Sequence, residues 1–299
     1  MSEPAGPTKS PTLTHDAFHR YGEPGATGPV IFAVPHAGRI YAPDLLARAR
    51  VAPDILARLE DRHADRLADG LIDQGHCVLV ATQPRALIDL NRDERDVDLR
   101  AIADAPWGFH SQPSAKVRGG LGLIPERLGQ AGNLWHRPLS YAELRRRIDT
   151  IHRPYHAALA EALETARARH GIALLVDIHS MPPLRETAMH DPVPRAVIGD
   201  RFGRSATDRL TDLVADIVRR QALPVAINSP YSGNHILERH GRPERGIHAI
   251  QIELDRSLYL AADLMTLGAG LARMQRLLVD LATIVTQDMA GRDFPLAAE

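Results

Sequence analysis

The 299-residue sequence is poor in cysteine and lysine and has no long apolar run, and each shortage removes a class of structure. Its one cysteine, Cys77, excludes a disulfide bond within the chain, and its apolar neighbours predict a buried structural thiol rather than a nucleophile. Lysine occurs only at positions 9 and 116, so arginine, which can bind a carboxylate through two parallel hydrogen bonds, carries nearly all the positive charge. No apolar segment approaches the roughly 20 residues that a membrane-spanning helix needs.

Charge and local motifs exclude further classes. The formal net charge is −1 and no stripe of basic and aromatic residues is present, so nucleic-acid binding is disfavoured. The absence of a Gly-x-Ser-x-Gly motif disfavours a serine hydrolase. The N-terminus is polar and proline-rich and lacks the basic start and apolar centre of a secretion signal. We therefore expect a cytoplasmic protein without membrane partners, in which residues 1–14 form a disordered tail and residues 15–299 a single domain.

Apolar runs and helical periodicities alternate along the chain, which is typical of an α/β fold with a mixed, largely parallel sheet flanked by helices. Strands are predicted at residues 30–34, 77–81, 172–178, 225–227 and 249–254, with a further short apolar element at 87–90. Helices are predicted at residues 53–74, 140–170, 205–220 and 260–287. Gly75 and Gly171 mark helix ends, and Pro154 should kink or interrupt its helix. Residues 101–140 hold many Gly and Pro residues and predict a long functional loop.

Polar residues stand where three of these strands end, and sheets of this kind bind ligands at the carboxyl ends of their strands. His36 follows the first strand, His179 lies near the end of the clearest buried strand, and Glu253 interrupts the last one. Two strand-end histidines and one carboxylate are the ligand set of many hydrolytic zinc sites. Asp61 and Asp65 are both candidates for that carboxylate, and each would otherwise be a solvated residue at a helix start.

The same residues also have purely structural interpretations. A strand-end histidine is often only a hydrogen-bonded residue of the framework. An unpaired carboxylate inside an apolar strand is costly, so Glu253 indicates a role in a site. Asp177 lies two residues before His179 and therefore points to the same side of the strand. It either orients that histidine or anchors a neighbouring loop.

Arg85, Asn91 and Arg92 suggest a grip for a carboxylate. They stand at the ends of apolar segments, and arginine binds carboxylates through paired, charge-assisted hydrogen bonds. The alternative is a surface salt-bridge network with the acidic residues between positions 94 and 98.

The segment 228–235 follows a strand directly, and its Pro and Gly predict a shaped loop. Such a loop could form one wall of a binding pocket, with Asn228 and Tyr231 as candidate substrate-binding residues. Alternatively, the segment is a turn with no role in binding.

Eight short motifs occur in an order that resembles one enzyme family. They are Pro35–Gly38, Asp61–Asp65, Ile88–Arg92, Gly120–Pro125, Arg153–His156, Asp177–Pro182, Asn228–Gly233 and Gln251–Leu254. Together, from about residue 28 to residue 260, they resemble the N-formylglutamate amidohydrolase family. Any one of these short motifs is weak evidence alone, so the resemblance rests on the occurrence of all eight in this order.

The resemblance implies a fold related to that of zinc carboxypeptidases and aspartoacylase, with one bound zinc ion. It implies that His36 and His179 are zinc ligands, that Asp61 is the carboxylate ligand, and that Glu253 is the catalytic glutamate. In the carboxypeptidases the acidic ligand is a glutamate three residues after the first histidine. Arg39 stands at that position here, so the carboxylate ligand must come from elsewhere in the chain.

The activity implied by the resemblance is hydrolysis of the amide bond of a small N-acyl amino acid such as N-formyl-L-glutamate. Asn91 and Arg92, with Arg85, would hold the α-carboxylate of the substrate. Iron or cobalt could occupy a histidine–carboxylate site in place of zinc. Two alternatives stay open: a carboxypeptidase-like hydrolase of short peptides, which would share the zinc site, and a non-catalytic metal-binding module, which would not need Glu253.

Overall fold

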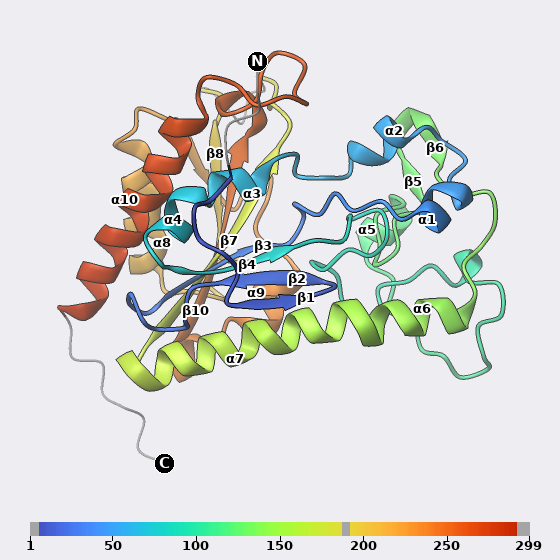
Figure 1. Ribbon diagram of the computed structural model, residues 1–299, viewed down its shortest axis with the longest axis horizontal. Coiled ribbons are helices and arrows are strands. Elements are labelled where there is room, and N and C mark those ends of the chain that lie inside the picture. Colours follow the sequence, from blue (N-terminus) through green and yellow to red (C-terminus); the bar gives the residue numbers. More distant parts are fainter. Residues whose placement is uncertain (1–5, 187–191, 292–299) are drawn as a thin grey trace.

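The structure is a computed structural model that describes residues 6–186 and 192–291 (Figure 1). Eight strands form one central sheet: β1 (Leu13–His15), β2 (Phe18–Tyr21), β3 (Val30–Val34), β4 (Cys77–Ala81), β7 (Ala173–Met181), β8 (Ala196–Gly199), β9 (Val225–Ile227) and β10 (Ile247–Asp255). Their order across the sheet is β1-β2-β4-β3-β7-β10-β8-β9. The central strands β4, β3, β7 and β10 are parallel to one another. Strand β2 is antiparallel to both β1 and β4, and β8 is antiparallel to β10 but parallel to β9. This arrangement confirms the predicted α/β fold with a mixed, largely parallel sheet.

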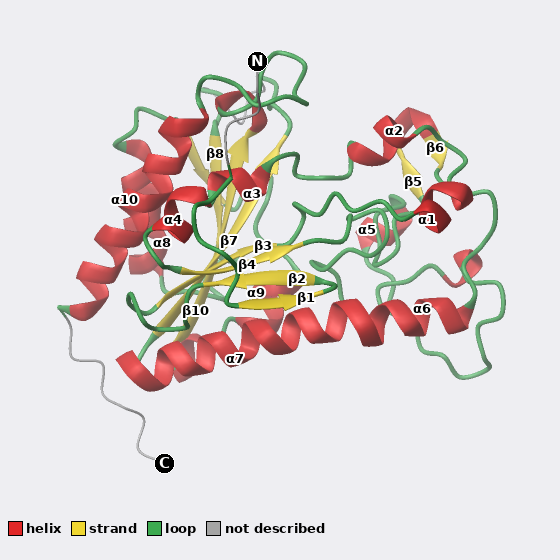
Figure 2. Ribbon diagram, in the orientation of Figure 1, coloured by secondary structure: helices red, strands yellow, loops and turns green. Residues whose placement is uncertain are grey.

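Helices cover both faces of the sheet, as Figure 2 shows. The α-helices are α1 (Pro43–Arg48), α2 (Pro53–Ala57), α3 (Ala64–Leu67), α4 (Asp69–Asp73), α5 (Ala115–Arg118), α6 (Tyr141–Arg147), α7 (Arg153–His170), α8 (Asp208–Arg219), α9 (His235–His240) and α10 (Leu271–Ala290). The remaining elements are the strand pair β5 (Arg127–Leu128) and β6 (Gly132–Asn133), the π-helical turn η3 (Ile148–His152), and the 3₁₀ turns η1 (Leu99–Ala101), η2 (Gly129–Ala131), η4 (Pro243–Arg245) and η5 (Arg256–Leu258). Helices α8 and α10 lie on one side of the sheet, and the long helix α7 crosses the other (Figure 1).

Two apolar cores lie on the two faces of the sheet because successive strand residues point to opposite sides. On β7, Leu174, Val176 and Ile178 pack into the core under α8 and α10. Ala173 and Leu175 point the other way, into the core under α7. All of these side chains are buried, so β7 is covered on both faces, as expected for a central parallel strand.

The row of side chains on the α7 face changes character along β7 and β10. Beyond Leu175 the row continues with Asp177 and His179, and on β10 it continues beyond Ala249 with Gln251 and Glu253. The first part of each strand therefore packs in the core, and the last part presents polar groups. These groups lie at the carboxyl ends of neighbouring parallel strands.

The structure confirms the strands predicted at the positions of β3, β4, β7, β9 and β10, and the helices at α7, α8 and α10. The sequence does not predict β1, β2 or β8, which are short and lie outside the central parallel strands of the sheet. The short apolar element at residues 87–90 consists of turn and irregular backbone. Residues 101–140 are mostly loop, as predicted.

The single helix predicted at residues 53–74 is wrong, because the chain breaks there into α2, α3 and α4. His63 adopts the left-handed conformation, with φ 57°, and this interrupts the helical path just before α3. The helix predicted at 140–170 is nearly continuous, but η3 joins α6 to α7 immediately before Pro154. Proline has no N–H to donate within a helix, which agrees with a local widening of the turn that precedes it. The segment predicted as helical from residue 260 becomes α10 only at Leu271.

Part of the predicted N-terminal tail, residues 1–5, lies outside the described residues. Farther along, Thr8 donates a backbone hydrogen bond to Asp73 Oδ1 at 2.7 Å, and Leu13 begins β1, so the sheet starts two residues before the predicted domain boundary. Among the helices of residues 6–186 and 192–291, none has both the length and the apolar character needed to cross a bilayer.

Candidate active site

Three neighbouring parallel strands, β3, β7 and β10, bring distant parts of the chain together at one end of the sheet. His36 follows β3, while His179 on β7 is the direct register partner of Glu253 on β10. Asp61 joins them because its backbone N–H donates to the carbonyl of His36 at 3.0 Å. The predicted grouping of strand-end residues therefore exists in the folded chain.

His36, Asp61 and His179 form what we call the strand-end site. One ligand atom from each lies within 4.8 Å of the others, and all three side chains are buried. Asp61 Oδ2 lies 3.0 Å from His179 Nδ1 and 3.5 Å from His36 Nδ1. His36 Nδ1 is buried without a hydrogen-bond partner among the described residues. An unpaired buried nitrogen that faces a carboxylate fits a site for a cation, which would satisfy both atoms.

The outer nitrogen of each histidine is held by a second carboxylate. Asp89 Oδ1 lies 2.7 Å from His36 Nε2, and Asp177 Oδ2 lies 2.9 Å from His179 Nε2. When Nε2–H donates to the carboxylate, the Nδ1 lone pair is left facing inward, which is how histidine ligands are oriented in zinc proteins. Of the two interpretations of Asp177, the contact supports the one in which it orients His179. The sequence gives no such signal for Asp89.

Asp61 and Asp89 are held in their ionised form. Burial would raise the pKa of Asp61, but its hydrogen bond with His179 and the close imidazole of His36 outweigh burial and keep that pKa well below its usual range. Burial of Asp89 is outweighed in the same way, chiefly by the positive charge of Arg85, so its pKa is also well below its usual range. Two imidazoles and an ionised carboxylate are a donor set that suits zinc and other borderline divalent ions.

Asp65, the other candidate for the carboxylate, does not belong to the strand-end site. Its two oxygens accept hydrogen bonds from Arg39 Nη1 and Nη2 at 2.6 and 2.8 Å. Arg39 lies three residues after His36. This arginine therefore engages Asp65, while Asp61 lies against both histidines.

Glu253 faces the same space from the neighbouring strand. Gln251, two residues earlier on the same face of β10, donates a hydrogen bond from Nε2 to Glu253 Oε1 at 3.0 Å. Burial, together with the negative charge of Asp61 and against the opposing effect of His179, raises the pKa of Glu253 to about 7. A carboxyl group that titrates near neutrality can both accept and donate a proton.

A cavity of about 360 Å³ opens over these groups. Eight of the nine predicted site residues line it: His36, Asp61, Arg85, Asn91, Arg92, His179, Tyr231 and Glu253. The cations Arg58, Lys116 and Arg256 also line it, and sequence reasoning misses all three. The cavity therefore combines a cation-binding end with a wall of basic side chains, which suits an anionic ligand.

Asn228 does not line this cavity. Its side-chain Nδ2 donates to Asp200 Oδ1 at 2.7 Å, and its Oδ1 accepts from the Asp200 backbone N–H at 3.0 Å. Asn228 also adopts a φ of 60°, a conformation that asparagine tolerates better than most residues. It shapes the loop that carries Tyr231 to the cavity, and we do not assign it to substrate binding.

Backbone contacts hold Arg92 and Asn91 in fixed positions at the cavity. The Arg92 guanidinium donates to the Leu121 carbonyl at 2.9 Å and to the Asn91 carbonyl at 2.7 Å. Asn91 Oδ1 accepts the backbone N–H of Ile236 at 2.9 Å, which leaves its Nδ2 3.4 Å from His179 Nε2. The alternative of a surface salt-bridge network does not describe Arg92, because its side chain is buried.

Arg256 supports Asp61 from outside the strand-end site. Its Nη2 lies 3.1 Å from Asp61 Oδ1, and its Nε donates to Ser180 Oγ at 3.2 Å. Asp61 thus has one oxygen directed at the histidines and the other held by an arginine. No sequence pattern marks Arg256, which simply follows β10.

Comparisons with known proteins agree with this geometry. Residues 28–260 match the family model described as N-formylglutamate amidohydrolase. The chain is 30% identical over 237 residues to an N-formylglutamate deformylase of Pseudomonas putida, which covers 78% of this chain and 82% of the relative. It is 28% identical over 239 residues to the deformylase of Pseudomonas aeruginosa, with the same coverage. The crystal structure of an N-formylglutamate amidohydrolase from Ralstonia eutropha JMP134 is similar, with a TM-score of 0.83 and 34% identity over 92% of this chain and 98% of that one.

Proposed function

The chain belongs to the N-formylglutamate amidohydrolase family and is an amidohydrolase, and from this premise we propose that it hydrolyses N-formyl-L-glutamate to formate and L-glutamate in a zinc-dependent reaction. The observation that carries the proposal is the convergence of the strand-end site, Glu253 and a basic wall on one cavity. The choice of substrate rests on the relatives named above, since two of them are called N-formylglutamate deformylases.

His36 Nδ1, His179 Nδ1 and Asp61 Oδ2 would hold the zinc ion. Their outer contacts with Asp89 and Asp177 support this assignment, because they fix the rings with the inner nitrogens facing the carboxylate. When bound, zinc would supply a Lewis acid that polarises the scissile carbonyl and lowers the pKa of a water molecule to about 7.

Glu253 would move the protons of the reaction. As a carboxylate it accepts a proton from the attacking water, and as an acid it then donates that proton to the departing amine of glutamate. Gln251 holds Oε1 of Glu253, which leaves the other oxygen available for the water. Hydrogen bonding between the two side chains fixes the direction in which the carboxyl group faces.

The basic wall would bind the two carboxylates of the substrate. Arg92 and Asn91, with Arg85, are assigned to the α-carboxylate because Asn91 lies 3.4 Å from His179 and both arginines line the same cavity. Lys116 lines the same cavity, and we assign it to the side-chain carboxylate. Burial and the charges of Arg92 and Arg85 lower the pKa of Lys116, so an anionic partner would stabilise its charged form.

The test is formate release by the full-length protein, first stripped with a chelator and then reloaded with zinc. We expect activity on N-formyl-L-glutamate to vanish and return with the metal. N-formyl-L-glutamine is the matched control substrate, since it lacks only the side-chain charge, and we expect its kcat/KM to be lower. Glu253→Gln protein that has been reloaded in parallel is the negative control.

Other results would change the assignment in defined ways. Release of formate that persists after complete metal removal would overturn zinc dependence. Equal kcat/KM for the two substrates would overturn the role of Lys116. Zinc binding without formate release would overturn the proposed activity and direct attention to short peptides as substrates, or to a non-catalytic metal-binding role.

A further inference from the structure

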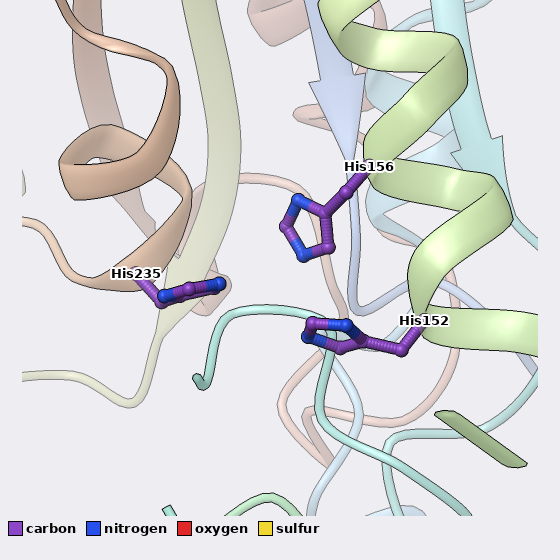
Figure 3. Close-up of side chains that lie close together, drawn as sticks. All are labelled: His152, His156 and His235. Carbon is purple, nitrogen blue, oxygen red and sulfur yellow. The ribbon is translucent and has the colours of Figure 1, made fainter. Parts of the chain in front are cut away.

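A second group of histidines lies between helices, away from the strand-end site. His152 ends η3, His156 lies one turn later on α7, and His235 begins α9 (Figure 3). We call these three residues the helix cluster. One ring nitrogen from each lies within 4.8 Å of the others, and all three side chains are buried. His152 and His156 are four residues apart, so they project from the same side of the helix toward His235 (Figure 3).

Two nitrogens of the helix cluster have no partner. His152 Nδ1 and His235 Nε2 are buried and make no hydrogen bond to any described residue. The other nitrogen of His152, Nε2, lies 2.8 Å from the backbone carbonyl of Arg92 and so must donate to it. His152 Nδ1 is then a lone pair that faces the cluster. A buried acceptor without a hydrogen-bond donor can be satisfied by a metal ion that binds its lone pair, or by a water molecule.

His156 is the third ring of the cluster, and both of its nitrogens have partners in the structure. Its Nε2 lies 3.0 Å from the carbonyl of Leu90 and donates to it, while its Nδ1 lies 2.9 Å from His240 Nε2 and accepts from it. An ion bound by His156 Nε2 would take the place of the proton on that nitrogen. The ring would then carry its proton on Nδ1 and donate it to His240, which would hold the ring as Asp89 holds His36.

We propose that the helix cluster is a second metal site, which binds one divalent ion of the zinc class through His152, His156 and His235. The donor set defines the class of ion, because imidazoles suit zinc and its neighbours whereas magnesium and calcium prefer oxygen ligands. The nearest carboxylate oxygen of Asp93 is 3.9 Å from His235 Nδ1, on the ring nitrogen opposite the unpartnered Nε2. The role of such a site is structural, since none of its three residues lines the cavity over the strand-end site.

The helix cluster holds the segment that carries the substrate-binding residues. His152 contacts the carbonyl of Arg92, and His156 contacts the carbonyl of Leu90. The residue after His235, Ile236, donates its N–H to Asn91. An ion in the cluster would therefore fix α7 and α9 against both sides of residues 90–92. This part of the inference rests on the proposed function, because it assigns Asn91 and Arg92 to the substrate.

The experiment counts metal ions, which requires no catalytic activity. Full-length protein is stripped with chelator, loaded with zinc, freed of excess and analysed by mass spectrometry for zinc per chain. We expect two ions in the wild type, one in His36→Ala, and one in the double variant His152→Gln/His235→Gln. His170→Gln is the matched control, since His170 lies on α7 outside the cluster and its Nε2 bonds the Gly25 carbonyl, and it should retain two.

A measurement on His36→Ala protein avoids any dependence on how the cluster variants fold. Loaded with cobalt(II), this variant should show the visible absorption of a histidine-bound ion. The second site is overturned if the wild type binds one zinc ion, His36→Ala binds none, and His36→Ala also fails to bind cobalt. That result leaves the strand-end site standing. Water then satisfies the helix cluster.

Kinetics separate the structural role from the metal count. His235→Gln should raise KM for N-formyl-L-glutamate several-fold with little change in kcat, because Arg92 and Asn91 lose their support while Glu253 does not. Unchanged KM in a variant that has lost one zinc would overturn the link to residues 90–92. Two zinc ions in a wild type that releases no formate would uphold the second site and overturn the proposed function instead.

Discussion

The strand-end site and the helix cluster are both built from buried histidines, but they differ in what surrounds the rings. The strand-end site includes an ionised carboxylate, Asp61, and opens into the cavity. The helix cluster has only imidazoles, and the rings of His152 and His156 contact two backbone carbonyls and another histidine. Catalytic zinc sites keep a position open to substrate, whereas structural sites are closed by protein. The surroundings of the rings, more than the rings themselves, thus separate a reactive site from a structural one.

The largest expected effect comes from removing a ligand of the strand-end site. His179→Ala should lower kcat/KM for formate release by about three orders of magnitude, since Lewis-acid stabilisation contributes several kcal/mol to the transition state. The same variant should keep any ion of the helix cluster. Steady-state kinetics and a zinc count on one preparation check both statements, and substantial remaining activity would mean that His179 is not a ligand.

Removing the proposed base should separate chemistry from metal binding. Glu253→Gln is expected to reduce kcat by about 100- to 10,000-fold, the usual contribution of a general base, because glutamine cannot accept the proton of the water. Zinc content should equal that of the wild type. A Glu253→Gln enzyme with wild-type kcat would show that another group performs the proton transfer.

Weakening the substrate grip should change KM more than kcat. Arg92→Ala is expected to raise KM by about ten- to a hundredfold, the effect of losing a hydrogen bond to a charged group. Arg92→Lys is the matched variant, and it should recover part of the loss because it keeps the charge but not the paired geometry. If KM is unchanged in Arg92→Ala, the substrate carboxylate binds elsewhere in the cavity.

The carboxylates behind the histidines should affect only the strand-end site. Asp89→Asn is expected to weaken zinc binding there by about 10- to 100-fold, because an amide no longer fixes the proton on His36 Nε2. Zinc titration against a competing chelator measures this change. Equal weakening at both metal positions would indicate a general loss of structure and would contradict the assigned role of Asp89.

The smallest expected effect concerns a buried polar atom that belongs to neither histidine group. The hydroxyl of Tyr155 on α7 is fully buried and has no hydrogen-bond partner among residues 6–186 and 192–291. Tyr155→Phe removes that unpaired group and should raise the free energy of unfolding by about 1 kcal/mol, with unchanged zinc content and activity. Chemical denaturation measures the difference, and a marked loss of stability would reveal a partner for the hydroxyl.

The strand-end site is predictable because its residues interrupt apolar strands. A histidine or glutamate in a run such as that of β7 or β10 is costly unless it serves a site, and parallel strands place their ends together. The sheet's centre is also predictable, since β3 and β4 are continuous apolar runs and most residues of β7 and β10 are apolar.

The remaining parts depend on contacts that no local pattern records. Asp89 meets His36, and Arg256 meets Asp61, across 53 and 195 positions of the chain. The helix cluster joins one turn of η3 and α7 to the start of α9, and the four-residue spacing of His152 and His156 says nothing of His235, which lies far along the chain. The break at His63 is equally hidden, because only the left-handed backbone conformation reveals it.

The division of β7 and β10 into an apolar first part and a polar last part also protects the register of the sheet. A slip of one residue along β7 would turn Asp177 and His179 onto the face covered by α8 and α10, where Val176, Ile178 and their apolar neighbours pack. Burying these groups there without partners would cost far more free energy than a ladder of backbone hydrogen bonds could recover. The residues that equip the chain for hydrolysis therefore also oppose misaligned pairing while the sheet assembles, and removing their charges should make strand slippage easier.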